Sequence, residues 1–339
     1  MGLSRSLVLA SIAVVSSLLP TASAAGIAIA GSSTVYPVTS LAIKKFRDTS
    51  QGDKISFNLR ATGSSAGFRD FCSNKIPLAN ASRPISSKEI KACQQNGVNF
   101  IELPIAFDAI TVVANQSNGW LNSLTPSELS RLWSKASQGK VSSWNQVNLD
   151  FPDKQIKLCG PGKDSGTFDI FNKAINKSTT NSRTDYKSSE DDNVIVNCVA
   201  NNSNALGYFG FSYFLNNRSK LKAIRIVNSK GNAILPSVAA VQKEIYQPLS
   251  RPLFLYVNDR SLRNNTSLRN FITYYLRNVE QLVTQANYIP LQNATYRLVD
   301  SKLYRHILGT SFGGKIPVGL TISQILQTSF DVHKKPQFR

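Results

Sequence analysis

Turns that combine glycine with serine or threonine precede an expected helix at three places in this sequence, and the clearest is Gly-Lys-Asp-Ser-Gly-Thr-Phe-Asp at 162–169. Asp164 and Ser165 suit a helix N-cap, and apolar residues follow at helical spacing. The first turn of such a helix has free N–H groups and the positive end of the dipole, to which Ser165 and Thr167 add hydroxyls. This combination predicts an anion site, although an ordinary capped helix would explain the stretch taken alone.

Two further stretches have the same character. A short apolar strand at 26–30 runs into Gly-Ser-Ser-Thr at 31–34, and a strand at 55–60 is followed by Gly-Ser-Ser-Ala-Gly at 63–67. A strand at 155–158 likewise precedes the stretch described above. Neither a G-x-G-x-x-G nor a Walker motif is present, so we expect a ligand smaller than a dinucleotide.

Two charged residues stand in apolar surroundings. Arg83 ends the apolar strand 78–85, where its guanidinium could bind an oxyanion with two hydrogen bonds or could simply lie on the surface. Asp108 lies inside the apolar run 107–113, which is costly unless the carboxylate has partners. It is therefore either a structural cap or an acceptor for a protonated ligand.

The polar run 187–192 is expected to be exposed.

The start of the chain predicts export. Residues 1–24 combine Arg5, an apolar run at 7–19 and a final Ala-Ser-Ala, which together are typical of a cleaved secretory signal. The apolar run is too short to span a membrane, and we expect a soluble mature protein. The remaining chain is long enough for two domains. We expect a periplasmic location.

The chain is strongly basic, with a formal charge of +19 that falls to +18 without residues 1–24. A charge of this size favours anionic partners, although it also fits a solvated basic surface. The basic residues are spread along the chain, and no nucleic-acid-binding signature is present.

Four cysteines in an exported chain predict two disulfides, for which three pairings are possible. Cys72 and Cys93 fall in one expected domain, and Cys159 and Cys198 in the other. Pairing within domains leaves a hinge free, whereas pairing across them would lock it. We therefore expect Cys72–Cys93 and Cys159–Cys198.

Strands that alternate with helices indicate an α/β fold. At this level the chain resembles the periplasmic phosphate-binding proteins of phosphate ABC transporters, the PstS type, and most of all their cyanobacterial branch. The resemblance spans nearly the whole mature chain and rests on these stretches, in the family's order: 31–37, 63–67, 81–85, 107–110, 160–169 and 206–208.

The resemblance implies a type II periplasmic binding protein, in which each domain is a mixed sheet flanked by helices. Residues 25–108 and 235–339 would form a discontinuous first domain, and residues 109–234 the second. Two crossover strands would form the hinge, and one phosphate would bind in the cleft between the domains. The implied phosphate-binding residues are Ser33, Thr34, Val35, Ser65, Arg83, Asp108, Ser165, Gly166 and Thr167.

One departure from the family affects this site. Many relatives have an arginine four residues before the serine of Ser-Gly-Thr, where this chain has Pro161, and an aspartate where it has Arg83. We therefore expect Arg83 to supply the guanidinium. Asp108 is the first candidate to accept the proton of phosphate, and Asp164 is the second. Such an acceptor would select phosphate over sulfate, which carries no proton at neutral pH.

Three other classes of function compete with this interpretation. An enzyme is disfavoured because the only histidines are His306 and His333 and because no G-x-S-x-G elbow or metal-ligand spacing is present. A binding protein for sulfate, molybdate or phosphonate is the alternative. A surface protein that binds nucleic acid or polysaccharide is the third. We expect a monomer without cofactor or metal, whose partners are inorganic phosphate and the permease and ATPase of an ABC transporter.

Overall fold

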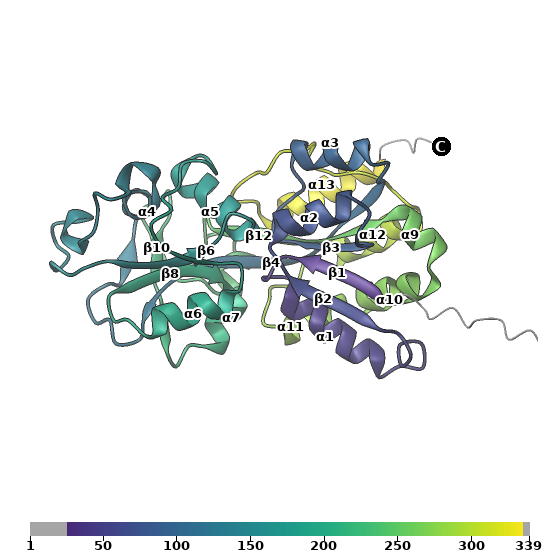
Figure 1. Cartoon of the computed structure of the whole chain (residues 1–339), viewed down its shortest axis with the longest axis horizontal. Helices are drawn as coiled ribbons and strands as arrows, with labels where there is room; N and C mark the ends of the chain where they lie inside the picture. Colours follow the sequence, from purple (N-terminus) through teal and green to yellow (C-terminus); the bar gives the residue numbers. More distant parts are fainter. Residues whose placement is uncertain (1–25, 335–339) are drawn as a thin grey trace, which may run out of the picture.

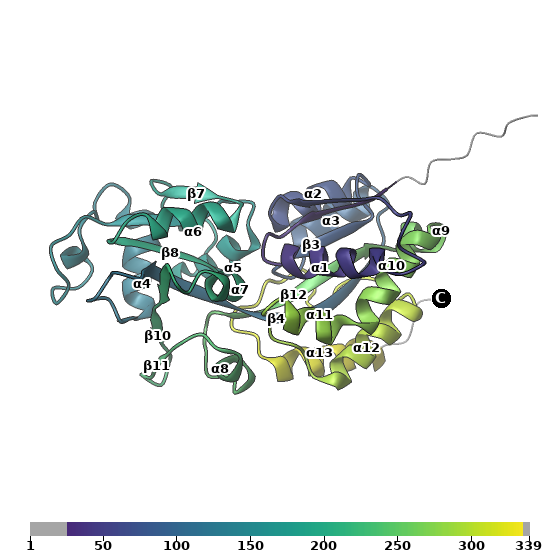
Figure 2. The ribbon, with the colours of Figure 1, turned by 90° about the horizontal axis from the view of Figure 1, so that it is seen from below.

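The computed structural model describes residues 26–334, so the predicted signal peptide lies outside the described residues. Two lobes lie side by side, and strands β4 (Phe100–Asn115) and β12 (Ser250–Asn258) run between them (Figures 1 and 2). Within the described part of the chain, no helix has the length and apolar character needed to span a bilayer.

One mixed sheet extends through both lobes in the order β2-β1-β3-β12-β4-β8-β6-β7, with β9 added on β4. The first part of β4 pairs antiparallel with β12, and its last residues pair with β8 instead. A second, three-stranded sheet has the order β11-β10-β5. The remaining strands are β1 (Ile27–Gly31), β2 (Phe57–Ala61), β3 (Leu78–Ala81), β5 (Ser123–Leu124), β6 (Lys157–Pro161), β7 (Lys187–Ser189), β8 (Ala205–Gly210), β9 (Leu221–Ala223), β10 (Arg225–Val227) and β11 (Ala233–Ile234).

The first lobe has helices on both faces of its sheet. Phe68, Phe71 and Phe254 belong to the core on the α2–α3 side, and Phe46, Phe271 and other apolar residues form the core on the α1–α10 side (Figure 1). The helices are α1 (Tyr36–Arg47), α2 (Ser64–Cys72), α3 (Ser87–Gln95), α9 (Asp259–Asn264), α10 (Thr266–Arg277), α11 (Val279–Gln285), α12 (Asn293–Tyr304) and α13 (Ile322–Lys334).

The second lobe surrounds the far end of β4, where Trp133 and Trp144 are fully buried. Its helices are α4 (Pro126–Trp133), α5 (Gly166–Asn176), α6 (Asp192–Ala200) and α7 (Phe211–Asn216), with 3₁₀ turns at Lys135–Ser137 and Trp144–Gln146; α8 (Val238–Gln242) packs against β4.

Local sequence explains where the helices of the site begin. Pro37 lies in the first turn of α1, where its missing N–H costs nothing. The Ser165 hydroxyl caps α5 by accepting a hydrogen bond from Thr167 N at 3.1 Å. Asp164, the other expected cap residue, has a different partner, which is described below.

The disulfides are Cys72–Cys93 and Cys159–Cys198, as the hinge argument predicts. The first links α2 to α3 in one lobe, and the second links β6 to α6 in the other. Neither disulfide crosses between the lobes, so both leave their relative motion unconstrained.

Candidate functional site

Three helix N-termini meet where the lobes touch: those of α1 and α2 from the first lobe and α5 from the second. Ser65 N donates a hydrogen bond to Asp164 O at 2.9 Å. The hydroxyls of Thr34 and Thr167, 133 residues apart in sequence, are 3.3 Å apart. The structure therefore brings the three hydroxyl-bearing turns of the sequence to one place.

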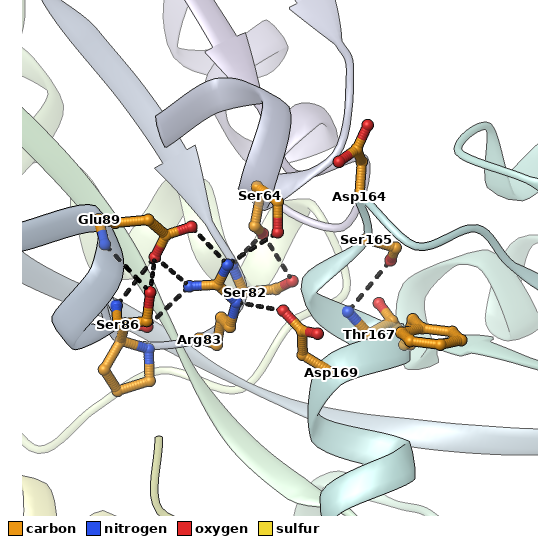
Figure 3. A network of polar contacts seen from close by, with 12 residues as sticks. Ser64, Ser82, Arg83, Ser86, Glu89, Asp164, Ser165, Thr167 and Asp169 are labelled. Carbon is orange, nitrogen blue, oxygen red and sulfur yellow. Dashed lines mark hydrogen bonds and ion pairs between the residues drawn. The ribbon is translucent and has the colours of Figure 1, made fainter. Parts of the chain in front are cut away.

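The approach of α5 to α2 depends on a glycine. A Cβ atom at Gly166 would lie 2.6 Å from both Ser64 Oγ and Ser82 Oγ, which is closer than side chains pack. These two hydroxyls are 3.3 Å apart, and Ser64 Oγ also accepts from Ser82 N (Figure 3). The glycine at this position thus permits direct backbone contact between the lobes.

Arg83 is buried, and its guanidinium is surrounded by acceptors (Figure 3). Its Nε donates to Asp169 of α5 at 2.5 Å, and Glu89 of α3 accepts from both Nη atoms at 2.7 and 2.8 Å. Its Nη1 also donates to Pro84 O, and its Nη2 donates to Ser65 Oγ at 2.8 Å. All five donors of this arginine are occupied by protein atoms. Burial raises the pKa of Asp169, although the nearby Arg83 opposes this rise.

Asp108 is also fully buried, in the middle of β4. Its Oδ2 accepts from Nε and Nη2 of Arg251 at 3.1 and 2.8 Å, and its Oδ1 accepts from Phe211 N at 2.9 Å. Arg251 Nη2 donates to Thr34 Oγ1 at 3.1 Å. The carboxylate is thus held by an arginine that the sequence analysis missed. The signal that could have found it is a single charge in the apolar stretch 250–257.

The prediction of an exposed run at 187–192 is wrong at its end. Asp192, the first residue of α6, has 1% of its surface exposed. Burial raises its pKa to about 7; Asp108 and Asp191 add to the rise, whereas Arg251 and the Ser33 hydroxyl oppose it. The polar residues before Asp192 suggest a solvated surface, but the start of α6 turns the Asp192 side chain inward.

Asp164, the second acceptor candidate, lies at the rim. It receives two hydrogen bonds from Arg69 of α2, at 2.6 and 2.9 Å, and both side chains are partly exposed. The bonds from Arg69 lower the pKa of Asp164. Its backbone N donates to Glu190 Oε1 at 3.1 Å. Asp164 therefore joins the two lobes at the edge of their contact.

Of the nine residues predicted for the site, six belong to the starts of α1 and α5 and are buried, although the Val35 side chain packs in the core of the first lobe. Ser33, Thr34 and Val35 immediately precede α1, while Ser165, Gly166 and Thr167 form the start of α5. Ser65 lies in the first turn of α2 and contacts both Asp164 and Arg83. Arg83 and Asp108 lie behind these turns, each engaged by protein partners. In residues 26–334, no group of three His, Cys, Asp or Glu side chains is arranged to hold a metal ion.

Comparison with known proteins finds a matching family model and relatives that cover most of the chain. A family model described as "PBP superfamily domain" matches residues 19–279. The Protein SphX of Synechocystis sp. is 45% identical over 319 residues, which covers 94% of each chain. The phosphate-binding protein PstS of Staphylococcus aureus strain USA300 is 34% identical over 268 residues, 79% of each chain.

Solved structures have the same fold. A possible phosphate binding protein from Planctomyces limnophilus has a TM-score of 0.61 at 35% identity, covering 83% of this chain and 98% of its own. A putative phosphate ABC transporter substrate-binding protein from Clostridium perfringens, solved with bound phosphate, has a TM-score of 0.66 at 24% identity and coverage of 79% and 100%. The latter likeness concerns the fold, a two-domain α/β architecture of the type II periplasmic binding class.

Proposed function

Because the chain belongs to the PBP superfamily and, within it, to the family of the SphX and PstS phosphate-binding proteins, we propose that it captures inorganic phosphate between its lobes and delivers the ion to an ABC transporter. The observation that carries this proposal is the meeting of three helix N-termini, with buried hydroxyls from both lobes. Such termini replace water around an oxyanion with oriented N–H and O–H donors.

The residues proposed to contact the ion are those of the three helix starts: Ser33, Thr34, Val35, Ser65, Ser165, Gly166 and Thr167. Arg83 and Asp108 contribute through their neighbours. Arg83 fixes the Ser65 hydroxyl through its Nη2. Asp108 orients Arg251, which reaches Thr34.

We also propose that the lobes move as domains, with residues 25–108 and 235–339 in one and residues 109–234 in the other. The two strands that run between the lobes, β4 and β12, support this division, because they are the natural hinge. The lobes contact each other through polar side chains at the rim, and through hydroxyls and the buried Arg83–Asp169 ion pair within.

The proposed role is binding and transport, without catalysis. The Staphylococcus aureus relative is a phosphate-binding protein by name. His306 is paired with Asp259 of α9, in the first lobe and away from the helix starts. We propose a monomer in the periplasm, retained there after export, whose protein partners are the permease and ATPase of the transporter.

A titration of the ion-free mature protein tests this proposal. Phosphate, sulfate and molybdate would be compared by calorimetry and by thermal unfolding at constant ionic strength. Phosphate present at a hundred times its Kd should stabilise the protein by about 2.7 kcal/mol, while the other anions leave the unfolding temperature unchanged. Preferential stabilisation by sulfate or molybdate would assign the protein to another oxyanion, and no response to any anion would refute the proposal.

A further inference from the structure

Two buried polar atoms in the cluster between the lobes have no hydrogen-bond partner: Arg251 Nη1, a donor, and Asp192 Oδ2, an acceptor. Both side chains have only 1% of their surface exposed. A buried polar atom without a partner is costly, and native proteins rarely keep one without a reason such as a ligand or an ordered water. Here one donor and one acceptor remain in the same cluster.

The position of Arg251 is fixed by its other donors. Nε and Nη2 bind Asp108, and Nη2 also reaches Thr34 Oγ1, which in turn lies 3.3 Å from Thr167 Oγ1. The guanidinium is planar and rigid, so these bonds determine where Nη1 points. Its free N–H groups therefore adjoin the hydroxyls proposed to bind phosphate.

Asp192 approaches the same cluster from the second lobe. Burial raises the pKa of Asp192; the charge of Arg251 on β12 and the Ser33 hydroxyl lower it, and the charges of Asp108 on β4 and of Asp191, the N-cap residue of α6, raise it further. Burial raises the pKa of the Tyr213 and Tyr288 phenols, and the charge of Asp192 adds to both rises. Tyr213 donates a hydrogen bond to Ser33 O at 3.2 Å, so the start of α1 is held against this side of the second lobe.

Resting on the proposed function, we propose that Arg251 and Asp192 bind the phosphate ion directly, with Nη1 donating to a phosphate oxygen and Oδ2 accepting the proton of a P–OH group. Phosphate carries such a proton at neutral pH, and sulfate does not. Asp192 is then the residue that selects phosphate over sulfate. Asp108, whose oxygens already accept three hydrogen bonds, positions the arginine.

Asp192→Asn tests the acceptor, and Asp191→Asn is the matched control. The control makes the same change of charge one residue away, on an exposed side chain, and asparagine also serves as an N-cap. Asp192→Asn should weaken phosphate binding about 5- to 150-fold and should not weaken sulfate binding, whereas Asp191→Asn should stay within about twofold of the wild type.

Monofluorophosphate provides a second readout in the unmodified protein. It has the shape and double charge of hydrogen phosphate, but P–F replaces P–OH and cannot donate. The wild type should bind it at least about 5-fold more weakly than phosphate, and Asp192→Asn should remove this difference. Arg251→Lys keeps a positive charge beside Asp108 but lacks the planar guanidinium with its several donors. It should therefore weaken the binding of phosphate and of fluorophosphate to the same extent.

The outcomes separate the two proposals. A wild type that binds no phosphate would refute the proposed function itself. A wild type that binds phosphate and fluorophosphate equally well, or an Asp192→Asn protein with unchanged selectivity, would overturn this inference alone. Unchanged affinity in Arg251→Lys would mean that Nη1 contacts an ordered water and not the ion.

Discussion

Replacing Gly166 by alanine should prevent the lobes from closing while leaving each lobe intact. Gly166 begins α5 in the second lobe, and the atoms that would meet its new methyl group, in Ser64 and Ser82, belong to the first lobe. Alanine is a better helix former than glycine, so α5 itself should gain up to about 1 kcal/mol. The substitution therefore has opposite effects on folding and on closure.

The cost of closure follows from the contact distances. The methyl group would lie 2.6 Å from the two hydroxyl oxygens, against about 3.4 Å for an ordinary contact, so the serines must move by about 0.8 Å. Rotation of Ser64 Oγ would break its contacts with Ser82 N and Ser82 Oγ, at a cost of about 0.5–1.5 kcal/mol each. Ser64 Cβ, at 3.1 Å, remains in the way after such a rotation. A penalty of about 1–3 kcal/mol corresponds to about 5- to 150-fold weaker phosphate binding.

Calorimetry measures the affinity, and thermal unfolding of the ion-free protein measures the stability. Gly119→Ala is the matched control, because a Cβ atom at Gly119 meets nothing within 4 Å. We expect Gly166→Ala to lose affinity without a lower unfolding temperature, and Gly119→Ala to bind normally. A Gly166→Ala protein that binds phosphate within twofold of the wild type would refute the idea that this contact forms on closure.

Two further predictions concern the rim of the junction. Arg69→Gln removes the exposed ion pair with Asp164, which is worth at most about 1 kcal/mol. Phosphate affinity should therefore fall by up to about 5-fold at low salt and be unchanged at high salt. An equal loss of affinity at both salt concentrations would contradict an ion-pair role. Burial raises the pKa of Glu190 to about 7, so the folded state holds this proton more tightly than the unfolded state, and stability should fall as the pH rises from about 4.5 to about 7. Because Glu190 is partly solvated, we expect Glu190→Gln to gain about 1–2 kcal/mol at pH 8 and nothing at pH 4, as measured by urea unfolding; equal effects at both pH values would contradict this assignment.

Much of the site could be predicted because its signals are local. Each hydroxyl-bearing turn lies between a short strand and a helix start, and this order can be read within a dozen residues around Ser33, Ser65 or Ser165. The cysteine pairing followed from the need for a free hinge. Pro104 lies inside the continuous strand β4, and the register against β12 shifts between Leu253 and Phe254 opposite this point.

The missed residues depend on distant partners. Arg251 is 143 residues from Asp108 in sequence, and its neighbours in the chain, a serine and a proline, do not indicate a buried ion pair. Asp192 follows five polar residues, which suggests solvent exposure, and only the packing of α6 against the second lobe's sheet turns it inward. Burial of a single charge is decided by tertiary packing, which residue patterns within one segment do not encode.

The charges of the junction explain why oriented donors must carry the binding. Around the three helix starts, the two buried arginines, Arg83 and Arg251, face four carboxylates, those of Glu89, Asp108, Asp169 and Asp192. This cluster has no excess of positive charge with which to attract an anion, even though the whole chain is strongly basic. Attraction must therefore come from individual oriented donors: the helix N-termini, the hydroxyls fixed by the ion pairs behind them, and the N–H groups of Arg251 Nη1 that we propose to bind the ion. In such a site the carboxylates divide two tasks: Glu89, Asp108 and Asp169 hold the arginines rigid, and the proposed acceptor, Asp192, penalises an anion that brings no proton of its own.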